Sequence, residues 1–291
     1  MIMNTLAFCL LLASQAWSAP KAPLVHGHRG CRAVLPENTI AAFDGALRAG
    51  ADVLETDLNV TKDGVVVVSH EQSVDPDICR FKDGRPAEKV PIRSLTLAEV
   101  KAYDCGSIKN PKFPKQMASP GQPIPTLAEL FAYVKASGYP NASKVEFNIE
   151  TKIVPGEPDL SPSPEEFARQ VVSVVRSAKM ESRTIIQSFD RRTLEAVRKL
   201  EPKIRLSMLL SDNLPDLAAV AKAQKVHFIS PHEPWITKED VRLLHAAGVK
   251  VAPWTVNDEK GWERMLDLRV DAVITDDPGA FIMFLKKRGL R

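Results

Sequence analysis

Residues 55–70 read ETDLNVTKDGVVVVSH, and this stretch decides how the rest of the chain is arranged. Two apolar, strand-like runs flank Asp63-Gly64, a pair that strongly favours a hairpin turn. A parallel strand would need a crossover of about a dozen residues or more, but only NVTKDG separates the two runs. We therefore predict that Val65–Ser69 is a strand that runs back antiparallel to the strand beginning at Val53.

The remaining chain alternates short β-rich runs with amphipathic stretches of helical period. Besides the hairpin strand, the predicted strands are Leu24–His28, Val53–Leu58, Val145–Thr151, Thr184–Ser188, Arg205–Leu210, Val226–Ser230, Lys250–Trp254 and Ala272–Thr275. The predicted helices between them include Thr39–Ala49, Pro164–Ala178, Arg191–Leu200, Leu214–Ala223, Lys238–Ala247 and Glu259–Leu268. Alternating strands and helices indicate a parallel sheet, and eight such units predict a closed (β/α)8 TIM barrel.

Residues 71–125 interrupt this alternation of strands and helices. The segment is rich in proline, lysine and glycine and contains one clear helical pattern, Thr96–Tyr103. We predict that it is a small insertion in a barrel domain spanning residues 19–291.

The first 18 residues have the pattern of a secretory signal peptide. Met1–Ser18 has no charged side chain, and the apolar run Leu6–Ala13 precedes a small-x-small cleavage site at Ala16-Trp17-Ser18. That run is too short to cross a bilayer, and no later segment is apolar enough to do so. We expect an exported protein, periplasmic or secreted, without stable membrane insertion; the alternative is a buried N-terminal helix.

The cysteines are consistent with export. Cys79 and Cys105 bracket the polar insertion, while Cys9 falls within the predicted signal peptide. We predict a disulfide between Cys79 and Cys105 and a free thiol at Cys31. The alternative is three separate thiols.

The charge balance excludes one class of partner. The chain has 39 basic and 36 acidic residues, a formal net charge of +3, and no long basic run. Such a small excess gives no electrostatic footprint for nucleic acid.

The hairpin brings acidic side chains and a histidine together. A two-residue turn at Asp63-Gly64 would place Asp57 opposite His70, and Glu55 shares the face of Asp57. Two adjacent carboxylates require a neutralising charge, which a metal ion supplies most simply. The alternative for this segment alone is a surface ion pair with His70.

Residues at other predicted strand ends favour a metal site over a surface ion pair. HGHRG puts His28 and Arg29 at the end of the first strand, and FNIETK puts Glu150 and Lys152 at the end of another. In a (β/α)8 barrel, these carboxyl ends form the active site.

This grouping assigns a role to each side chain. The all-oxygen set suits Ca²⁺ or Mg²⁺ and comprises Glu55, Asp57 and Glu150. His28 and His70 are the candidate general acid and base. Arg29 and Lys152 are cations suited to a phosphate group, and Trp254 is a candidate wall of the substrate pocket.

The order of these motifs resembles the glycerophosphodiester phosphodiesterase family, which has a phospholipase C-like phosphodiesterase barrel. The resemblance begins with HRG and PENTIAAFDGALRAGADVLETDLNVTKDGVVVVSHE and spans Val25 to Pro278. Further matching motifs are IPTLAEL, IETK, QSFD, WTVN and ITDDP. The chain departs from the family pattern at Ser69-His70-Glu71, where the family usually has His-Asp, and at Cys31.

The resemblance implies a (β/α)8 barrel with a small insertion after the hairpin. It implies metal-dependent hydrolysis of small-molecule glycerophosphodiesters to an alcohol and sn-glycerol 3-phosphate. By motif match, the acidic set binds metal, the two histidines are the acid–base pair, and the two cations lie near the phosphate. The alternatives are lysophospholipase D-type or cyclic-phosphate-forming chemistry, and a non-catalytic exported binding protein. The last is disfavoured because the metal-binding acids and both histidines are all present.

Overall fold

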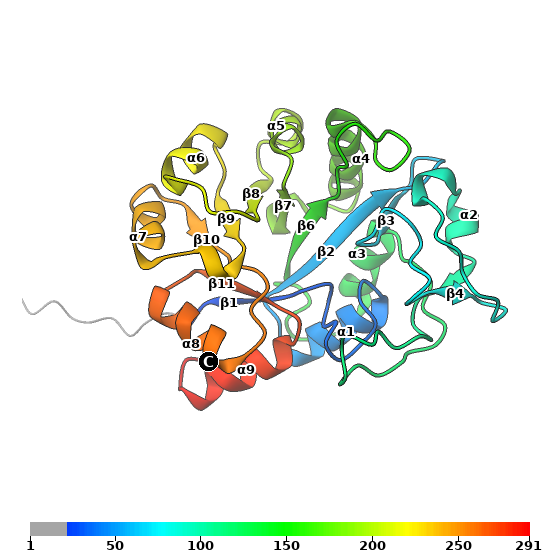
Figure 1. Ribbon diagram of the computed structural model, residues 1–291, viewed down its shortest axis with the longest axis horizontal. Coiled ribbons are helices and arrows are strands. Elements are labelled where there is room, and N and C mark those ends of the chain that lie inside the picture. The colour runs from blue at the N-terminus through cyan, green and yellow to red at the C-terminus, as the bar shows by residue number, and fades with distance from the viewer. Residues whose placement is uncertain (1–21) are drawn as a thin grey trace, which may run out of the picture.

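The computed structural model of the protein describes residues 22–291 and contains a nearly closed (β/α)8 barrel (Figure 1). The predicted signal peptide lies outside the described residues. The parallel barrel strands are β1 (Leu24–Gly27), β2 (Val53–Val60), β6 (Glu146–Thr151), β7 (Thr184–Ser188), β8 (Arg205–Leu210), β9 (Phe228–Pro231), β10 (Lys250–Val251) and β11 (Ala272–Thr275). The predicted fold class is confirmed.

The strands follow one another around the barrel in the order β10-β9-β8-β7-β6-β2-β1-β11. Backbone hydrogen bonds then link the two ends of this order. Asp271 N donates to Val251 O, and Ile274 N donates to Pro253 O, each at 3.0 Å. All eight strands are parallel, so their carboxyl ends open on the same face of the barrel.

Helices surround the strands (Figure 1). Their bounds are α1 (Ile40–Ala49), α3 (Leu127–Ala136), α4 (Pro164–Ser177), α5 (Arg191–Leu200), α6 (Leu217–Gln224), α7 (Lys238–Ala246), α8 (Glu259–Leu268) and α9 (Pro278–Lys287), with 3-10 turns η2 (Glu181–Arg183) and η3 (Glu233–Trp235). Local sequence sets these bounds: the Thr39 side chain accepts a hydrogen bond from Ala42 N at the start of α1, and Gly50 ends it at φ 92°.

The main apolar core lies between the strands and the helices. Its large, fully buried side chains include Phe43, Phe131, Phe147, Phe167 and Phe281. Each helix buries only one apolar stripe against the strands. Across residues 22–291, the structure contains no helix with both the length and the apolar character to cross a membrane.

The hairpin is present, but the predicted register is wrong by one residue. Strand β3 (Val66–Val68) runs antiparallel to β2, with Leu58 opposite Val68 and Val60 opposite Val66. The reason is a three-residue loop: Thr61 N bonds to Val65 O, and Gly64 has φ 81°. Asp57 therefore lies opposite Ser69, not His70, and Ser69 N donates to Asp57 O at 3.0 Å.

Residues 71–125 form a separate layer beside β3 (Figure 1). The segment contains β4 (Arg80–Phe81), η1 (Ile92–Ser94), α2 (Leu97–Val100) and β5 (Tyr103–Asp104). The predicted helix Thr96–Tyr103 is wrong at its carboxyl end, because Tyr103 pairs with Phe81 in a two-stranded sheet. A small apolar cluster of its own, including Val74, Ile92, Val100 and Ile124, packs this segment on the hairpin residue Val67.

The predicted disulfide is confirmed: Cys79 and Cys105 are bonded, and Cys31 is buried and has no disulfide partner among residues 22–291. The bond closes a sequence separation of 26 residues across the inserted segment. In the chain-entropy model, a loop of that length stabilises the fold by about 3–4 kcal/mol.

We expect Cys79→Ala combined with Cys105→Ala to lower the free energy of unfolding by about that amount. Urea unfolding of both proteins under non-reducing conditions measures the difference. Peptide mapping of the wild-type protein is the control, and detection of either cysteine as an alkylatable thiol before reduction would contradict the pairing.

Candidate active site

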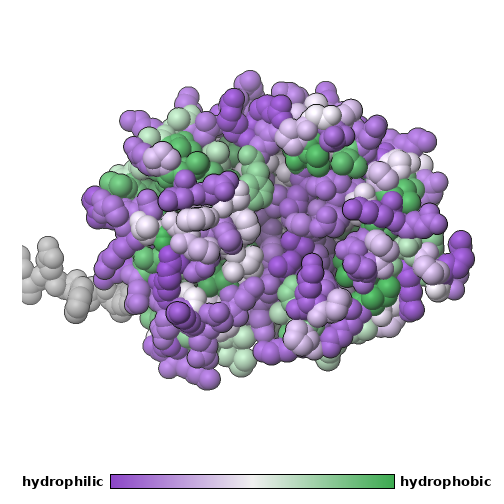
Figure 2. Space-filling model, viewed as in Figure 1, coloured by the Kyte–Doolittle hydropathy of each residue, from purple (hydrophilic) through white to green (hydrophobic). Residues whose placement is uncertain are grey.

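A pocket of about 230 Å³ opens at the carboxyl ends of the barrel strands. The residues that line it are His28, Arg29, Arg32, Glu55, His70, Glu150, Lys152, Gln187, Phe189, Leu209, Trp254, Thr255 and Ile274. Figure 2 shows a hydrophilic hollow near the centre of the face that is drawn. The structure thus brings together most of the site residues predicted from the sequence, and Asp57 lies directly beneath this lining, in contact with Arg29 and Lys152.

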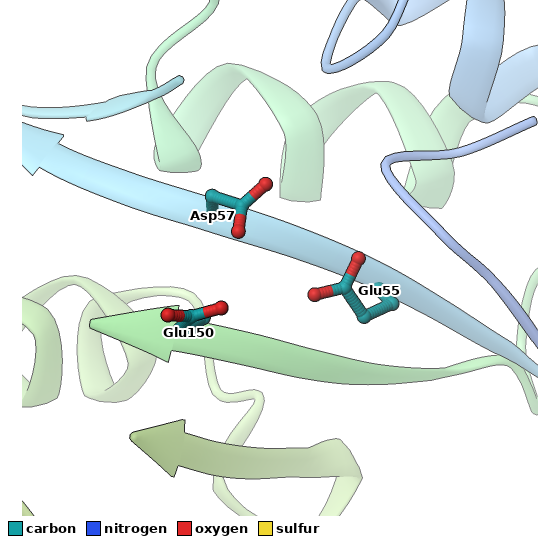
Figure 3. Close-up of side chains that lie close together, drawn as sticks. All are labelled: Glu55, Asp57 and Glu150. Atoms are coloured by element: carbon teal, nitrogen blue, oxygen red, sulfur yellow. The ribbon is translucent and has the colours of Figure 1, made fainter. Parts of the chain in front are cut away.

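Three carboxylates converge at the base of the site. Glu55 and Asp57 project from β2, and Glu150 projects from the neighbouring strand β6, where it pairs in register with Asp57 (Figure 3). One carboxylate oxygen from each residue lies within 4.8 Å of the others. The three residues are 1%, 1% and 6% exposed, so their charges are largely removed from water.

Burial and mutual repulsion make this cluster electrostatically costly. Burial, followed by the charge of Asp57, raises the pKa of Glu55 well above its usual range. Burial likewise raises the pKa of Glu150 to about 7, against the opposing effect of Lys152. Burial would raise the pKa of Asp57 too, but Lys152 and Arg29 hold it well below its usual range. The cluster therefore contains more acid than its two neighbouring cations compensate.

Arg29 and Lys152 are those cations, and both are paired with acids. Lys152 Nζ lies 2.9 Å from Glu150 Oε1 and 3.3 Å from Asp57 Oδ1. Arg29 Nη1 donates to Glu37 Oε1 at 2.7 Å, and its Nε lies 3.2 Å from Asp57 Oδ2. Both residues still line the pocket, where a bound phosphate could reach them.

The cluster fits a hard divalent cation. Its ligands are all oxygens, which Ca²⁺ and Mg²⁺ prefer. Within residues 22–291, Asp57 Oδ1 is buried and accepts no hydrogen bond, with only the Lys152 ammonium nearby at 3.3 Å, and the Asn38 side-chain amide donates to the other oxygen, Oδ2, at 3.0 Å. An oxygen left in this state is available as a metal ligand, and a dication would offset the excess negative charge.

His28 is held by an acid that the sequence analysis did not single out. Its Nδ1 lies 2.6 Å from Oδ1 of Asp276, which directly follows β11. Arg32 Nε donates to the same oxygen at 2.6 Å, and Asn257 Nδ2 donates to Oδ2 at 2.8 Å. Burial would raise the pKa of Asp276, but the hydrogen bond to His28 and the charge of Arg32 hold it well below its usual range.

Two signals in the sequence could have identified Asp276. It lies in the ITDDP motif, and it comes one residue after a predicted barrel strand. Because Asp276 holds Nδ1 of His28, the other ring nitrogen, Nε2, is directed toward the carboxylates and lies 3.8 Å from Glu55 Oε2. Burial, as the largest influence, lowers the pKa of His28 to about 4.

His70 reaches the same pocket from the end of the hairpin, just after β3. Its side chain is 28% exposed, and its Nδ1 lies 2.6 Å from Glu71 Oε1. Glu71 replaces the aspartate that usually follows this histidine in the family pattern, and it still supplies a carboxylate partner. Each histidine thus has one ring nitrogen bonded to an acid, and its other ring nitrogen makes no hydrogen bond within the part of the chain that the structure describes.

Aromatic rings form one wall of the pocket. Trp254 contacts Phe189 edge-on, with ring centroids 5.7 Å apart, and lies 5.0 Å from the His232 ring. Phe189 is 46% exposed. His26, in contrast, is buried and does not line the pocket.

The fold and site define a (β/α)8 barrel with two histidines and a buried carboxylate cluster in one pocket at its strand ends. A comparison with protein families identifies the class more closely: residues 28–280 match the glycerophosphoryl diester phosphodiesterase family. The chain belongs to this family, and it is accordingly a phosphoric diester hydrolase.

Curated relatives align over nearly their whole lengths. A glycerophosphodiester phosphodiesterase of Caldanaerobacter subterraneus is 34% identical over 266 residues, covering 91% of this chain and 99% of the relative. A glycerophosphodiester phosphodiesterase of Bacillus subtilis is 30% identical, covering 90% of this chain and 86% of the relative.

Solved structures share the fold. A crystal structure from Silicibacter pomeroyi, assigned to the same phosphodiesterase class, superposes with a TM-score of 0.85 at 31% identity, covering 94% of this chain and 96% of that chain. An Oleispira antarctica phosphodiesterase, solved in complex with the product sn-glycerol-3-phosphate, superposes with a TM-score of 0.75 at 24% identity, covering 91% and 97%.

Proposed function

We propose that the protein hydrolyses glycerophosphodiesters to an alcohol and sn-glycerol 3-phosphate, with Ca²⁺ or Mg²⁺ held by Glu55, Asp57 and Glu150. The observation that carries this proposal is the convergence of three buried carboxylates beside His28 in a pocket at the strand ends. The activity named for the curated relatives supports the substrate class.

A divalent ion bound there would draw charge from the phosphate and lower the pKa of an attacking hydroxyl. Arg29 and Lys152 bind the remaining phosphate oxygens, because both cations line the pocket next to the carboxylates. Trp254 and Phe189 pack against the apolar part of the substrate and keep bulk water from the reacting phosphate.

His28 and His70 divide the proton transfers. Phosphodiester cleavage needs a base to deprotonate the attacking oxygen and an acid to protonate the departing alkoxide. Asp276 holds Nδ1 of His28, so the proton moves at Nε2, and Glu71 constrains His70 in the same way. The two rings reach one pocket from the ends of different strands, so each can serve a different proton of the reaction.

Two alternatives within the same chemistry follow from the choice of nucleophile and substrate. A free glycerol hydroxyl could attack the phosphate and form a cyclic phosphate, or the enzyme could cleave lysophospholipids as a lysophospholipase D. Phosphorus NMR of products from glycerophosphocholine, glycerophosphoethanolamine and lysophosphatidylcholine separates these outcomes. We expect sn-glycerol 3-phosphate from the first two substrates. A cyclic phosphate as the final product, or preferential cleavage of lysophosphatidylcholine, would overturn the proposed reaction.

We also propose that residues 1–18 direct export and that residues 19–291, with residues 71–125 as a small insertion, remain as the exported barrel domain. The disulfide within that segment supports an oxidising compartment. Cell fractionation with N-terminal sequencing tests the export. A mature protein that starts at Met1 in the cytoplasm would contradict it.

Asp276→Asn should slow turnover by about 10²-fold while leaving KM within about threefold of the wild-type value. The substitution removes the charge that orients His28 and stabilises its protonated form, but leaves the phosphate contacts in place. Steady-state kinetics on glycerophosphocholine measures both constants. Unchanged kcat would show that His28 does not depend on this pairing.

A further inference from the structure

A column of buried polar side chains runs from Glu55 down the inside of the barrel. Gln187 Nε2 donates to Glu55 Oε1 at 2.7 Å, and Asn148 Nδ2 donates to Gln187 Oε1 at 2.8 Å. Below them, the His26 Nδ1 atom lies 3.5 Å from the same Asn148 nitrogen. All four side chains are 1% exposed.

The column crosses a barrel interior that could have been apolar throughout. The layer beneath it is apolar and consists of Ile185, Phe228, Ala252, Ala272 and Leu24. Burying amides and an imidazole costs free energy unless their hydrogen bonds are satisfied. Two atoms of the column, His26 Nε2 and Asn148 Oδ1, have no hydrogen-bond partner among the described residues. Packing alone does not account for polar groups at these positions.

The direction of the hydrogen bonds indicates that the column orients the Glu55 carboxylate. Asn148 donates to the Gln187 carbonyl oxygen, so the Gln187 amide nitrogen must face Glu55. The other oxygen of Glu55 accepts from Arg29 N at 2.9 Å. Each oxygen of this carboxylate is therefore held by one N–H donor, which fixes the plane of the group.

Glu55 differs from Asp57 and Glu150 in the kind of group that holds its carboxylate. Lys152 lies against both Asp57 and Glu150. Within residues 22–291, no lysine or arginine side-chain nitrogen lies within 4.0 Å of the Glu55 carboxylate. Its orientation thus depends on neutral donors, of which Gln187 is the one contributed by a side chain.

We propose that Gln187, fixed in turn by Asn148, is a positioning residue that holds the Glu55 carboxylate in place for divalent-metal binding. This inference rests on the proposed function, since it takes Glu55 to be a metal ligand. Partners that orient a metal ligand typically contribute 10–100-fold to metal affinity or activity.

Gln187→Met tests the proposal, because methionine keeps most of the volume and removes the donor. Asn148→Leu is an independent second variant that leaves Gln187 present but free to rotate. Ser207→Ala is the matched control: Ser207 neighbours Gln187 on the adjacent strand and is 1% exposed. It makes its own buried bond to Ser230 at 2.8 Å, away from Glu55.

Calorimetric titration with Ca²⁺ and with Mg²⁺, and melting temperatures of the metal-free proteins, give two separate readouts. We expect Gln187→Met to weaken metal binding by about 10–100-fold and Asn148→Leu by a smaller factor. Ser207→Ala should bind metal as tightly as the wild type, even if all three variants melt at similarly lowered temperatures. If Gln187→Met fails to fold, Asn148→Leu decides the question.

Failure of the positioning role and failure of the proposed metal-dependent function would give different results. Wild-type metal affinity in both Gln187→Met and Asn148→Leu would overturn the positioning role while leaving the metal site intact. Absence of metal binding by the wild-type protein would overturn the proposed metal-dependent function, and the positioning role with it.

Discussion

Asp57→Asn is expected to reduce turnover by about 10³-fold or more. The substitution removes the carboxylate that faces both other acids and both cations of the site. A divalent ion contributes several kcal/mol to transition-state stabilisation, and about 1.4 kcal/mol corresponds to a tenfold change in rate. Steady-state kinetics with excess metal, combined with calorimetric metal titration, measures the loss.

The control is Asp212→Asn, which removes an exposed acid that follows β8 on the same face of the barrel and contacts the Ser211 hydroxyl. This variant should keep wild-type turnover and metal affinity. Near-normal activity of Asp57→Asn would show that Asp57 is not a metal ligand.

His28→Ala and His70→Ala should each slow hydrolysis of glycerophosphocholine by roughly 10²–10⁴-fold, the usual contribution of a positioned acid or base. The reason is that each ring has one nitrogen fixed by a carboxylate and the other free for proton transfer. Because the two histidines serve different protons, their responses to the leaving group should differ.

A substrate with an activated leaving group, such as a nitrophenyl phosphodiester, needs little help from an acid. It should restore turnover in the variant that lost the acid and leave the other variant slow. His232→Ala, which alters a histidine in contact with the aromatic wall, is a control for general disturbance of the pocket. Near-wild-type turnover of either His28→Ala or His70→Ala on glycerophosphocholine would contradict the two-histidine assignment.

The barrel and the acidic cluster could be predicted because both follow from local rules. The turn at Asp63-Gly64 excluded a parallel connection, and strand alternation placed Glu55 and Asp57 on one face. The position of Glu150 at the end of another strand followed from the barrel itself. These inferences needed only sequence spacing and the geometry of parallel strands.

The hairpin register could not be predicted in the same way. Asp63-Gly64 is compatible with a two-residue or a three-residue loop, and the choice depends on hydrogen bonds made after folding. In the structure, Thr61 Oγ1 accepts from Val65 N, and Asp63 accepts from Leu97 N in the inserted segment. The second of these contacts is long-range, and it favours the three-residue loop.

Contacts between residues far apart along the chain also could not be predicted from the sequence. His28 and Asp276 are separated by 248 positions, yet β1 and β11 are neighbours in the barrel. Gln187 belongs to the motif QSFD, but nothing in that motif predicts its bond to Glu55 inside the barrel. Such contacts depend on which strands are adjacent and on the side-chain rotamers, which strand periodicity does not specify.

The most direct test of the central claim is the release of sn-glycerol 3-phosphate from glycerophosphocholine by the purified protein, measured with and without excess chelator. Elemental analysis confirms removal of the metal before the assay. The account predicts product with Ca²⁺ or Mg²⁺, no turnover after chelation, and recovery when either ion is restored. Full turnover by the metal-free protein would contradict it.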